Sequence, residues 1–599
     1  MKTRRPKSLC IRNAAWLAVL LFSTLTATAW AESPYRVQTQ SPVVIIGDVH
    51  GAFDAMVSAL RTAGLVDESL SWTGADTHLV SVGDVIDRGD KSREAMDLLM
   101  RLQDEAPAAG GAVHVILGNH EALNLSRDLR YLTPTELAAF AEFDPSGKGD
   151  AVLGHRAAFG SDGRYGQWLL ELPLALIVNR TLIVHAGVSE DLLGLSLDEV
   201  NAKGLTELKQ VVEAMETLVA EGHARPEDEY RAVRQAGKTI AASDSPLKAM
   251  ATELVDNLNN GLAFSPDGPL WYRGSAMCHP FTESSVVDAA LAHFDVDRIL
   301  IGHTPTRDGR LHQRLDGKVI RVDTGMNTAY YGGAPTAVRI IDGVLEAIYV
   351  ESGAGFVTES ARVWKRPGGM SDEEIEAFLR TAEVVKTEDL AEGVTKPKRL
   401  TLSAGDQTLR AVFKTFDSDP RLERGRWGRL GDKADRYHFD VAAYHLDRLL
   451  GLEMVPPAVL REVDGTPGTV QLWMENAVNE KARQERQVQF NPVCDLSDQY
   501  NLMNVFDALI VNEDRNLSNV LYVQPTWKVW LIDHTRAFRS DTKLPKMDRR
   551  NSVTVTDAMA KALANLSDEA LDDALSPYLH SRQLKGLKAR RDRLIKLAR

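Results

Sequence analysis

Residues 83–89, Gly-Asp-Val-Ile-Asp-Arg-Gly, follow the apolar run 79–82 and decide the fold of the first half of the chain. The same pattern, a short apolar run that stops at polar residues beside glycine, occurs four more times. The other polar sequences are Gly-Asp-Val-His-Gly at 47–51, Gly-Asn-His-Glu at 118–121, His-Ala-Gly at 185–187 and Gly-His-Thr at 302–304. Short buried strands that end in such loops predict that these side chains lie along one edge of a sheet.

Two amphipathic stretches, 53–63 and 92–105, separate the first three apolar runs. A strand, helix, strand, helix, strand order predicts a largely parallel start and an α/β fold class.

The polar residues offer carboxylate, imidazole and amide oxygen ligands, which suit borderline divalent ions such as Mn, Fe or Zn. We expect Asp84 to bridge two ions through its two oxygens. The other expected ligands are Asp48 and His50 for one ion, and Asn119, His185 and His303 for the second. Two such cations acidify a bridging water and clamp both oxygens of a phosphoryl displacement, so the pattern predicts a hydrolase.

Four further residues complete the expected chemistry. His120 is the candidate general acid for the leaving oxygen, and Asp87 is expected to orient it and to raise its pKa. Arg88 and Arg273 supply planar guanidinium groups for phosphate oxygens. Glu121 is expected to be a hydrogen-bond partner behind the ligands rather than a ligand.

These motifs resemble the calcineurin-like metallophosphoesterase superfamily, and GDVIDRG with GNHE resembles its phosphoprotein phosphatase (PPP) branch. Asn124-Leu125, Arg130-Tyr131 and residues 268–273 are more similar to the bacterial Shewanella-like phosphatases than to the eukaryotic serine/threonine enzymes. The resemblance covers 42 to about 350. It implies a four-layer α/β sandwich with a dinuclear metal centre, and it gives the metal, acid and phosphate residues named above the same roles.

A mostly helical, acidic insertion at about 189–269 departs from the family pattern. A cap over the site would decide substrate size, whereas the alternative is a purely structural role. The natural substrate is therefore not transferred from the family.

The second half is expected to begin after residues 366–370, a Pro-Gly break, at Ser371, which opens a helix as a capping box. Lys414 lies on the strand-like run 409–416, and Asp440 begins the next helical run, 439–450. Asp514 and Asn519 form D-x-x-x-x-N, and Asp533 follows the strand 527–532. These are the polar parts of a phosphotransferase: Lys414, paired with Asp440, for nucleotide phosphates, Asp514 for the acceptor proton, and Asn519 with Asp533 for Mg²⁺.

This half resembles the atypical kinases related to phosphoinositide kinases over roughly 371–540. The resemblance implies an α+β kinase-like domain with Mg²⁺ and ATP as cofactors. Residues 403–406 indicate a hairpin turn in place of a Gly-rich loop, and Asp-His-Thr at 533–535 stands in place of Asp-Phe-Gly. Active kinase and binding module both remain open.

Composition and the first residues predict an exported protein. The chain of 599 residues has 70 basic and 83 acidic residues, a net charge of −13, which argues against a general nucleic-acid binder. Residues 1–31 combine five cations, an apolar run and an Ala-Trp-Ala end, which predicts a cleaved signal peptide and a periplasmic or secreted location without a membrane span in the mature chain. Only Cys278 and Cys494 then remain, so no disulfide framework is expected.

We therefore predict a signal peptide (1–31), a metallophosphatase domain (32–365), a linker (366–370) and a kinase-like domain (371–599). The predicted function is hydrolysis of phosphate monoesters, on a phosphoprotein or a small molecule, by a metal-bridging hydroxide. One alternative is a phosphoanhydride hydrolase of nucleotides or dinucleotides. The other is a regulatory protein whose kinase-like half recruits a ligand.

Overall fold

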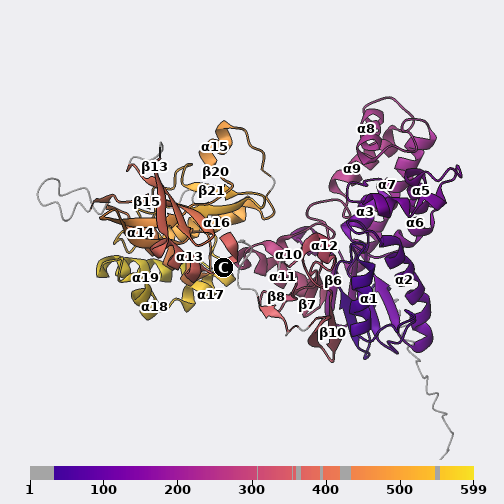
Figure 1. Ribbon diagram of the computed structural model, residues 1–599, viewed down its shortest axis with the longest axis horizontal. Coiled ribbons are helices and arrows are strands. Elements are labelled where there is room, and N and C mark those ends of the chain that lie inside the picture. The colour runs from indigo at the N-terminus through magenta and orange to yellow at the C-terminus, as the bar shows by residue number, and fades with distance from the viewer. Residues whose placement is uncertain are drawn as a thin grey trace, which may run out of the picture.

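The computed structural model describes residues 33–598 except 307, 352, 354, 359–365, 391–394, 419–433, 491 and 547–552. The expected signal peptide, 1–31, lies outside the described residues. Figure 1 shows two lobes, which correspond to the first and second halves of the chain.

The first half contains two sheets. The five-stranded sheet has the order β11-β10-β2-β3-β4, and the β2, β3 and β4 strands are parallel, as the sequence predicts. Its strands are β2 (Val43–Ile46), β3 (His78–Ser81), β4 (Ala112–Val115), β10 (Thr336–Ile341) and β11 (Val344–Tyr349). The seven-stranded sheet has the order β1-β5-β6-β7-β9-β8-β12. Its strands are β1 (Arg36–Val37), β5 (Ala175–Val178), β6 (Thr181–Val184), β7 (Arg298–Ile301), β8 (His312–Arg314), β9 (Val319–Arg321) and β12 (Val357–Thr358).

The two sheets pack face to face. Ile45 and Val80 of one sheet share a buried apolar cluster with Ile183, Leu300 and Ile320 of the other. Helices cover the outer faces, among them α1 (Phe53–Thr62) and α2 (Ser92–Glu105) beside the five-stranded sheet and α11 (Pro280–Phe294) in the other layer (Figure 1). The polar loops therefore come from two sheets, and the expectation of a single sheet edge was wrong, because the apolar runs alone do not say which strands pair.

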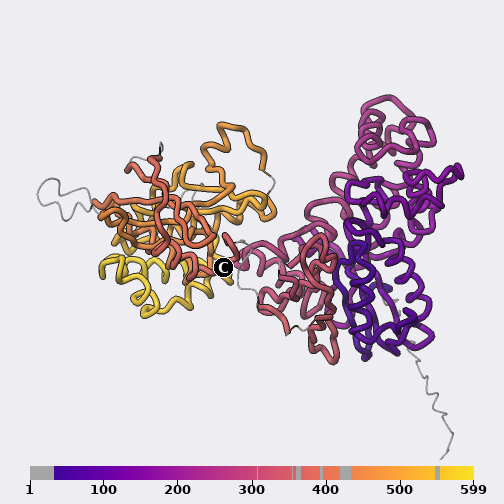
Figure 2. Tube along the Cα trace, in the orientation of Figure 1, coloured from indigo at the N-terminus to yellow at the C-terminus, as the bar shows by residue number. Residues whose placement is uncertain are grey.

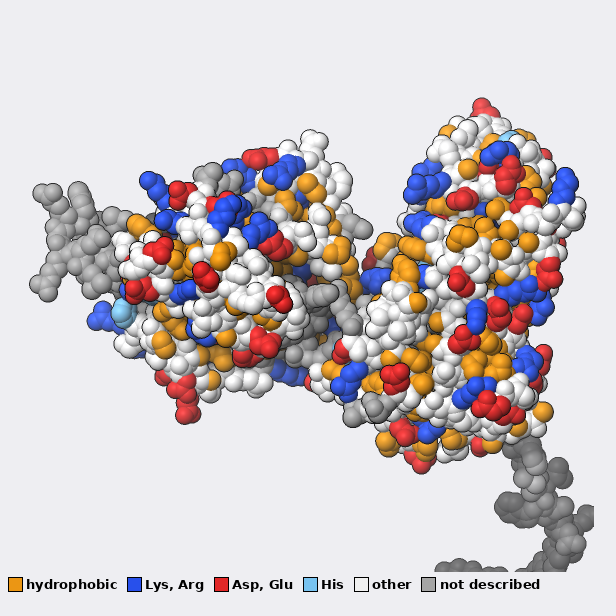
Figure 3. Space-filling model, viewed as in Figure 1, with side chains coloured by type: hydrophobic (Ala, Val, Ile, Leu, Met, Phe, Trp, Pro, Cys, Tyr) orange, Lys and Arg blue, Asp and Glu red, His pale blue; other side chains and the backbone are white. Residues whose placement is uncertain are grey.

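The insertion is helical, as expected, and is built from α7 (Leu197–Ala220), α8 (Tyr230–Ala241) and α9 (Lys248–Asn260). The three helices pack around their own apolar cluster, which includes Val211, Leu218, Val233 and Leu254. Shorter helices complete this half: α3 (Asn119–Leu125), α4 (Pro134–Ala138), α5 (Ala151–Phe159), α6 (Arg164–Leu169), α10 (Gly274–Met277) and α12 (Thr328–Tyr331). A notch separates the insertion from the second half on the face shown in Figure 3.

The second half begins with α13 (Asp372–Thr381), whose N-cap Ser371 forms a capping box with Glu374. An antiparallel sheet of order β13-β14-β15-β19-β18 follows, and Gly405 and Asp406 form its expected hairpin turn. Its strands are β13 (Glu383–Asp389), β14 (Lys398–Ala404), β15 (Gln407–Lys414), β18 (Ala458–Val463) and β19 (Thr466–Leu472). The other strands are β16 (Asp417–Ser418), β17 (Asp435–Arg436), β20 (Ala477–Asn479), β21 (Val520–Val523) and β22 (Lys528–Leu531). The helices are α14 (His438–Leu450), α15 (Glu480–Glu485), α16 (Leu496–Ile510), α17 (Asp557–Asn565), α18 (Asp568–Leu575) and α19 (Ser581–Ile595).

A disulfide joins the two halves, between Cys278 and Cys494, with a Cα–Cα distance of 5.4 Å. No disulfide framework is expected from the sequence. This bond was missed because 216 residues separate the two cysteines. Close to the disulfide, α11 packs against α17, so that C-terminal helices lie beside the middle of the chain (Figure 2). Within the described part of the chain, no helix is both long enough and apolar enough to cross a bilayer.

Candidate active site

The polar loops at the strand ends have an unusual backbone. His50, Asp84, Asp87, Arg88 and His303 have φ angles of 49°, 50°, 73°, 69° and 63°. Residues with a Cβ avoid this left-handed region. Each such residue costs of order 1–3 kcal/mol, so it persists only where the surrounding structure imposes it. Because five of them surround one point of the structure, the loops are held in shape by their neighbours, as is typical of functional sites.

Asp84 lies at the centre of the site. Its Oδ2 is 3.6 Å from Nε2 of His50 and 3.3 Å from Nε2 of His185. Two groups of possible metal ligands share Asp84: it joins His50 and His120 in one group and His185 and His303 in the other. Asp84 is therefore common to both groups, and its bridging role stays a prediction.

The remaining predicted ligands surround these two groups. Asn119 places its Oδ1 3.1 Å from Nε2 of His185, and Asp48 accepts a hydrogen bond from the His303 amide at 2.9 Å. Two fully buried atoms, Oδ1 of Asp48 and Nε2 of His303, have no hydrogen-bond partner among the described residues. Buried polar atoms are costly without a partner. A pair of divalent cations fits this donor set.

Hydrogen bonds to the backbone fix two of the imidazoles. Nδ1 of His50 donates to the Ile86 carbonyl at 3.1 Å, and Nδ1 of His185 donates to the Val82 carbonyl at 2.8 Å. Each ring thus turns Nε2 toward Asp84, which is how ligating histidines are usually held. Burial alone would raise the pKa of Asp84, but His185 and His120 outweigh it and hold that pKa well below the usual range. The central carboxylate is therefore ionised.

His120 and Asp87 form the predicted pair, with 2.5 Å between Nδ1 and Oδ2. Asn124 donates to the other oxygen of Asp87 at 3.1 Å. Burial raises the pKa of Asp87 to about 8 and lowers the pKa of His120 to about 4. The expectation that Asp87 raises the pKa of His120 was therefore wrong, because desolvation of the ring dominates. At neutral pH the pair still holds a proton that can be passed on.

The two candidate phosphate-binding arginines both face this space. Arg88 donates to Nε2 of His50 at 2.7 Å and lies between the rings of Tyr131, Tyr330 and Tyr331, with 5.1–5.5 Å from its guanidinium carbon to the ring centroids. The rings hold the guanidinium in place by cation–π attraction.

Arg273 approaches from the other side and donates to Oγ1 of Thr304 at 2.9 Å and to the His303 carbonyl at 3.3 Å. It is the N-cap residue of α10. The two guanidinium groups therefore reach the site from different loops.

Two acidic residues lie behind these groups. Glu121 accepts hydrogen bonds from the amides of Asp84, Val85 and Gly118 at 2.8–2.9 Å, the supporting position expected for it. Asp323 was missed: it is buried beside the site, and its Oδ2 has no partner among the described residues. The strand β9 before it repeats the pattern of the other loops, but Arg321 interrupts the apolar run and hides the signal.

Gly118→Ala tests how tightly the loops are packed. An added Cβ would lie 2.3 Å from the backbone nitrogen of Asp84, which cannot move without shifting the central carboxylate. We expect kcat/KM to fall by about 10²-fold, the usual effect of a misplacement of about 1 Å. Gly194→Ala is the control, since nothing lies within 4 Å of its Cβ. Equal activity of both variants would contradict this account of the loop.

The polar residues of the second half also come together. Nζ of Lys414 is 2.8 Å from Oδ2 of Asp440 and 3.0 Å from Oδ1 of Asp533. Burial works against the charge of Lys414, but the two carboxylates outweigh it and raise its pKa. Asn519 lines the same cavity of about 420 Å³. Asp514 accepts a hydrogen bond from Arg536 at 3.1 Å.

Several known proteins are similar to parts of this chain. The family model described as calcineurin-like phosphoesterase matches residues 41–307. "Shewanella-like protein phosphatase 1" of Plasmodium berghei is 26% identical over 318 residues, which are 52% of this chain and 75% of that protein. The cold-active protein-tyrosine phosphatase of a psychrophilic Shewanella species is 27% identical, with 53% of this chain and 82% of that chain covered and a TM-score of 0.38. A hydra Fam20 structure covers 37% of this chain and 88% of its own at 17% identity and a TM-score of 0.29.

The first half thus has a metallophosphoesterase fold, a class that uses divalent metal ions. Since the matching family model is a phosphoesterase and relatives of this half include proteins named as phosphatases, the protein is a metal-dependent phosphatase.

Proposed function

We propose that the first half hydrolyses phosphate monoesters at the site around Asp84. The observation that carries the proposal is the position of Asp84 between His50 on one side and His185 with His303 on the other, next to the His120–Asp87 pair. The cations would be held by Asp84 together with Asp48, His50, Asn119, His185 and His303. When bound, the two cations activate an attacking water and neutralise phosphate charge.

The roles of the other residues follow from their positions. Arg88 and Arg273 bind the non-reacting phosphate oxygens from two sides, which orients the ester for attack. His120 gives its proton to the leaving oxygen from Nε2, because its Nδ1 is engaged by Asp87. The hydrogen bond to Asp87 keeps the ring in this orientation throughout the reaction.

The substrate class is tested with the purified full chain and Mn²⁺, on phosphotyrosine and phosphoserine peptides, aryl phosphates and dinucleotides. Monoester hydrolysis supports the proposal. Turnover of dinucleotides alone would favour a phosphoanhydride hydrolase. No turnover of any of these substrates by protein that retains two ions per chain would refute the proposal.

We further propose that the protein is exported. The sequence of residues 1–31 supports a signal peptide. The disulfide also supports export, because disulfides persist in oxidising compartments such as the periplasm. A mature N-terminus after Ala31 in periplasmic or secreted material would be the expected finding, whereas full-length protein in the cytoplasm would contradict it.

We propose a second function for the kinase-like half, binding of a nucleotide with Mg²⁺. The support is the contact of Lys414 with Asp440 and Asp533. Lys414 and Asp533 line a cavity whose apolar walls include Val412 and Met474. Lysine for phosphates, a carboxylate for Mg²⁺ and an apolar wall for a base are the parts that such a site needs. Whether phosphate transfer follows is decided by assay with Mg²⁺ or Mn²⁺.

Asp533→Ala is expected to abolish Mg²⁺-dependent nucleotide binding, because Asp533 carries charge that holds Mg²⁺ against the phosphates. Calorimetry with ATP and Mg²⁺ measures the loss. Phosphatase turnover of an aryl phosphate should stay within about threefold, since no predicted phosphatase residue contacts Asp533 and distant sites behave independently. Asp557→Ala, at an exposed residue of α17, is a control that should change neither property. Absence of nucleotide binding in the wild type would leave the binding-module alternative.

A further inference from the structure

Arg273 sits on a short turn that Glu283 holds in place. Glu283 is 3% exposed and lies on α11. Its Oε2 accepts a hydrogen bond from the Tyr272 hydroxyl at 2.9 Å, and its Oε1 accepts one from Oγ of Ser275 at 3.1 Å. One buried carboxylate thus bonds the residue before Arg273 and the second residue after it.

The same turn is tied to its surroundings at two further points. Oγ of Ser275 accepts from the amide of Val188, three residues after the candidate ligand His185, at 3.3 Å. The buried guanidinium of Arg314 donates to the carbonyls of Ser275 and Cys278. The end of α10 that leads to Cys278 is therefore as fixed as the end that carries Arg273.

The second half holds the residues that follow. Cys278 forms the disulfide with Cys494, and His279 donates from Nε2 to the Gly451 carbonyl at 2.9 Å. Nδ1 of His279 accepts from the Phe281 amide at 3.1 Å and so caps α11. The N-terminus of the helix that carries Glu283 is thus fixed to the second half.

Two more contacts strengthen this attachment. The hydroxyl of Thr556 donates to the carbonyl of Phe281 at 2.6 Å. The ring of Phe281 is buried in the apolar cluster of the second half, with Leu563 and Leu566 among its members. A residue of the first half is therefore part of the core of the second.

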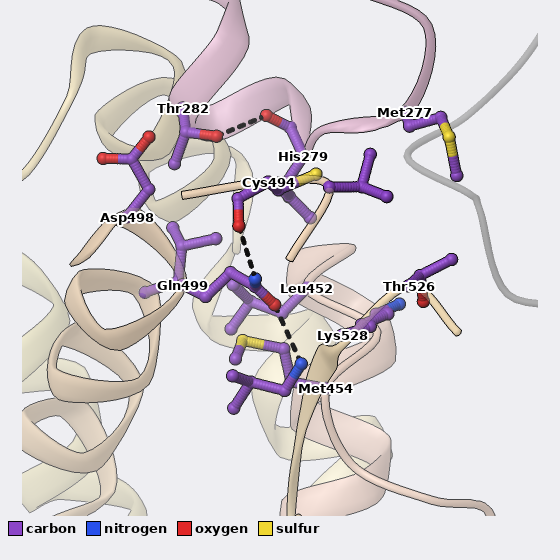
Figure 4. Close-up of a pocket in the computed structure, with 13 residues that line it drawn as sticks. Met277, His279, Thr282, Leu452, Met454, Cys494, Asp498, Gln499, Thr526 and Lys528 are labelled. Atoms are coloured by element: carbon purple, nitrogen blue, oxygen red, sulfur yellow. Dashed lines mark hydrogen bonds between the residues drawn. The ribbon is translucent and has the colours of Figure 1, made fainter. Parts of the chain in front are cut away.

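Cys494 is partly exposed, whereas Cys278 is buried. Cys494 borders a cavity of about 60 Å³ between the halves, which Met277 and His279 of the first half also line (Figure 4). Gln499 donates to the Cys494 carbonyl at 3.1 Å, the bond drawn in Figure 4, and holds the cysteine on its own half. Cleavage of the S–S bond would therefore leave each cysteine attached to a different half.

We propose that the second half positions Arg273 for phosphate binding, through α11 and Glu283, and that the Cys278–Cys494 disulfide makes this positioning dependent on redox state. The proposal rests on the proposed function, in which Arg273 binds substrate phosphate. In the redox step a small dithiol supplies two electrons and two protons. The S–S bond breaks to give two cysteine thiols, and the dithiol leaves as its own disulfide.

The experiment compares the oxidised and the dithiothreitol-reduced full chain on an aryl phosphate at saturating Mn²⁺. We expect reduction to raise KM by about 3- to 30-fold, the range found for coupling through packed elements, with a change in kcat of less than threefold. The inhibition constant of inorganic phosphate should rise in parallel with KM. Thiol titration confirms reduction, and metal analysis confirms that both ions remain.

Variants separate this route from general loosening. The Cys278→Ser, Cys494→Ser double variant should have the raised KM before and after dithiothreitol, which also controls for metal binding by the reagent. Glu283→Ala should raise KM similarly, Glu283→Gln should restore part of the loss, and the exposed Glu253→Ala should do nothing. In Arg273→Ala the redox effect should vanish.

The results distinguish two kinds of failure. An unchanged KM after verified reduction, or a redox effect that persists in Arg273→Ala, overturns the positioning proposal while the phosphatase proposal stands. An oxidised wild type without turnover, or an Arg273→Ala variant with normal KM, instead contradicts the proposed function or its phosphate assignment.

Discussion

Asp84→Asn is expected to remove phosphatase activity and at least one of the two metal ions. Asp84 is ionised and belongs to both groups of candidate ligands, so a neutral amide in its place weakens both. Replacing groups that merely support metal ligands already costs 10- to 100-fold, so we expect kcat/KM to fall by more than about 10²-fold.

Metal content per chain and turnover are measured on the same preparation, at low and at saturating Mn²⁺. Asp297→Asn is the matched control, because Asp297 is a half-exposed acid that forms an ion pair with Arg180, away from the site. Two ions retained with near-normal turnover in Asp84→Asn would rule out the bridging position of Asp84.

The ends of several strands, and the polar residues that meet around Asp84, were predictable because both leave local signals in the sequence. An apolar run that stops at Gly-Asp can be recognised from adjacent residues alone. The strands β2, β3 and β6 end within a residue or two of the predicted positions. Glycine is required at 118 because the backbone of Asp84 leaves no room for a Cβ. The glycine at 118 is therefore a sign in the sequence that the loops pack closely at this position.

Features that depend on distant residues were not predictable. The apolar runs do not state that β2–β4 and β6–β7 belong to different sheets, because pairing partners such as β10 lie almost 300 residues away. The disulfide joins residues 216 positions apart. Two cysteines without a repeated spacing give no signal for pairing.

Electrostatic environment was also hidden from the sequence. The spacing of Asp87 and His120 correctly indicated a contact, but the direction of the pKa shift depends on how deeply the ring is buried. Asp323 illustrates the same limit, since its significance lies in an unpartnered buried oxygen that only the packing reveals. A contact between two residues can be predicted from the sequence pattern, whereas the desolvation of a side chain depends on the complete fold.

The contacts between the two halves determine whether the chain can be divided for experiments. The sequence suggested two separate sets of site residues, and the structure keeps them apart, since Asp84 follows β3 in one sheet and Lys414 ends β15 in another. However, Phe281 belongs to the core of the second half although it lies in the first. A cut at residues 366–370 would expose this ring, so the full chain is the proper material for every assay.

His120→Asn should leave both metal ions and the fold in place while slowing hydrolysis of substrates with poor leaving groups by roughly 10²- to 10⁴-fold, the usual contribution of a general acid. His120 is held by Asp87 through Nδ1, and this bond leaves Nε2 to face the leaving oxygen. The defect should shrink on aryl phosphates with acidic phenols, because these leave without protonation. The measurement is kcat/KM against the leaving-group pKa for the wild type and the variant. The control is His223→Asn, because His223 is an exposed residue of the insertion. Parallel lines for wild type and variant would show that His120 is not the acid, since a general acid must matter most where the leaving group is least stable.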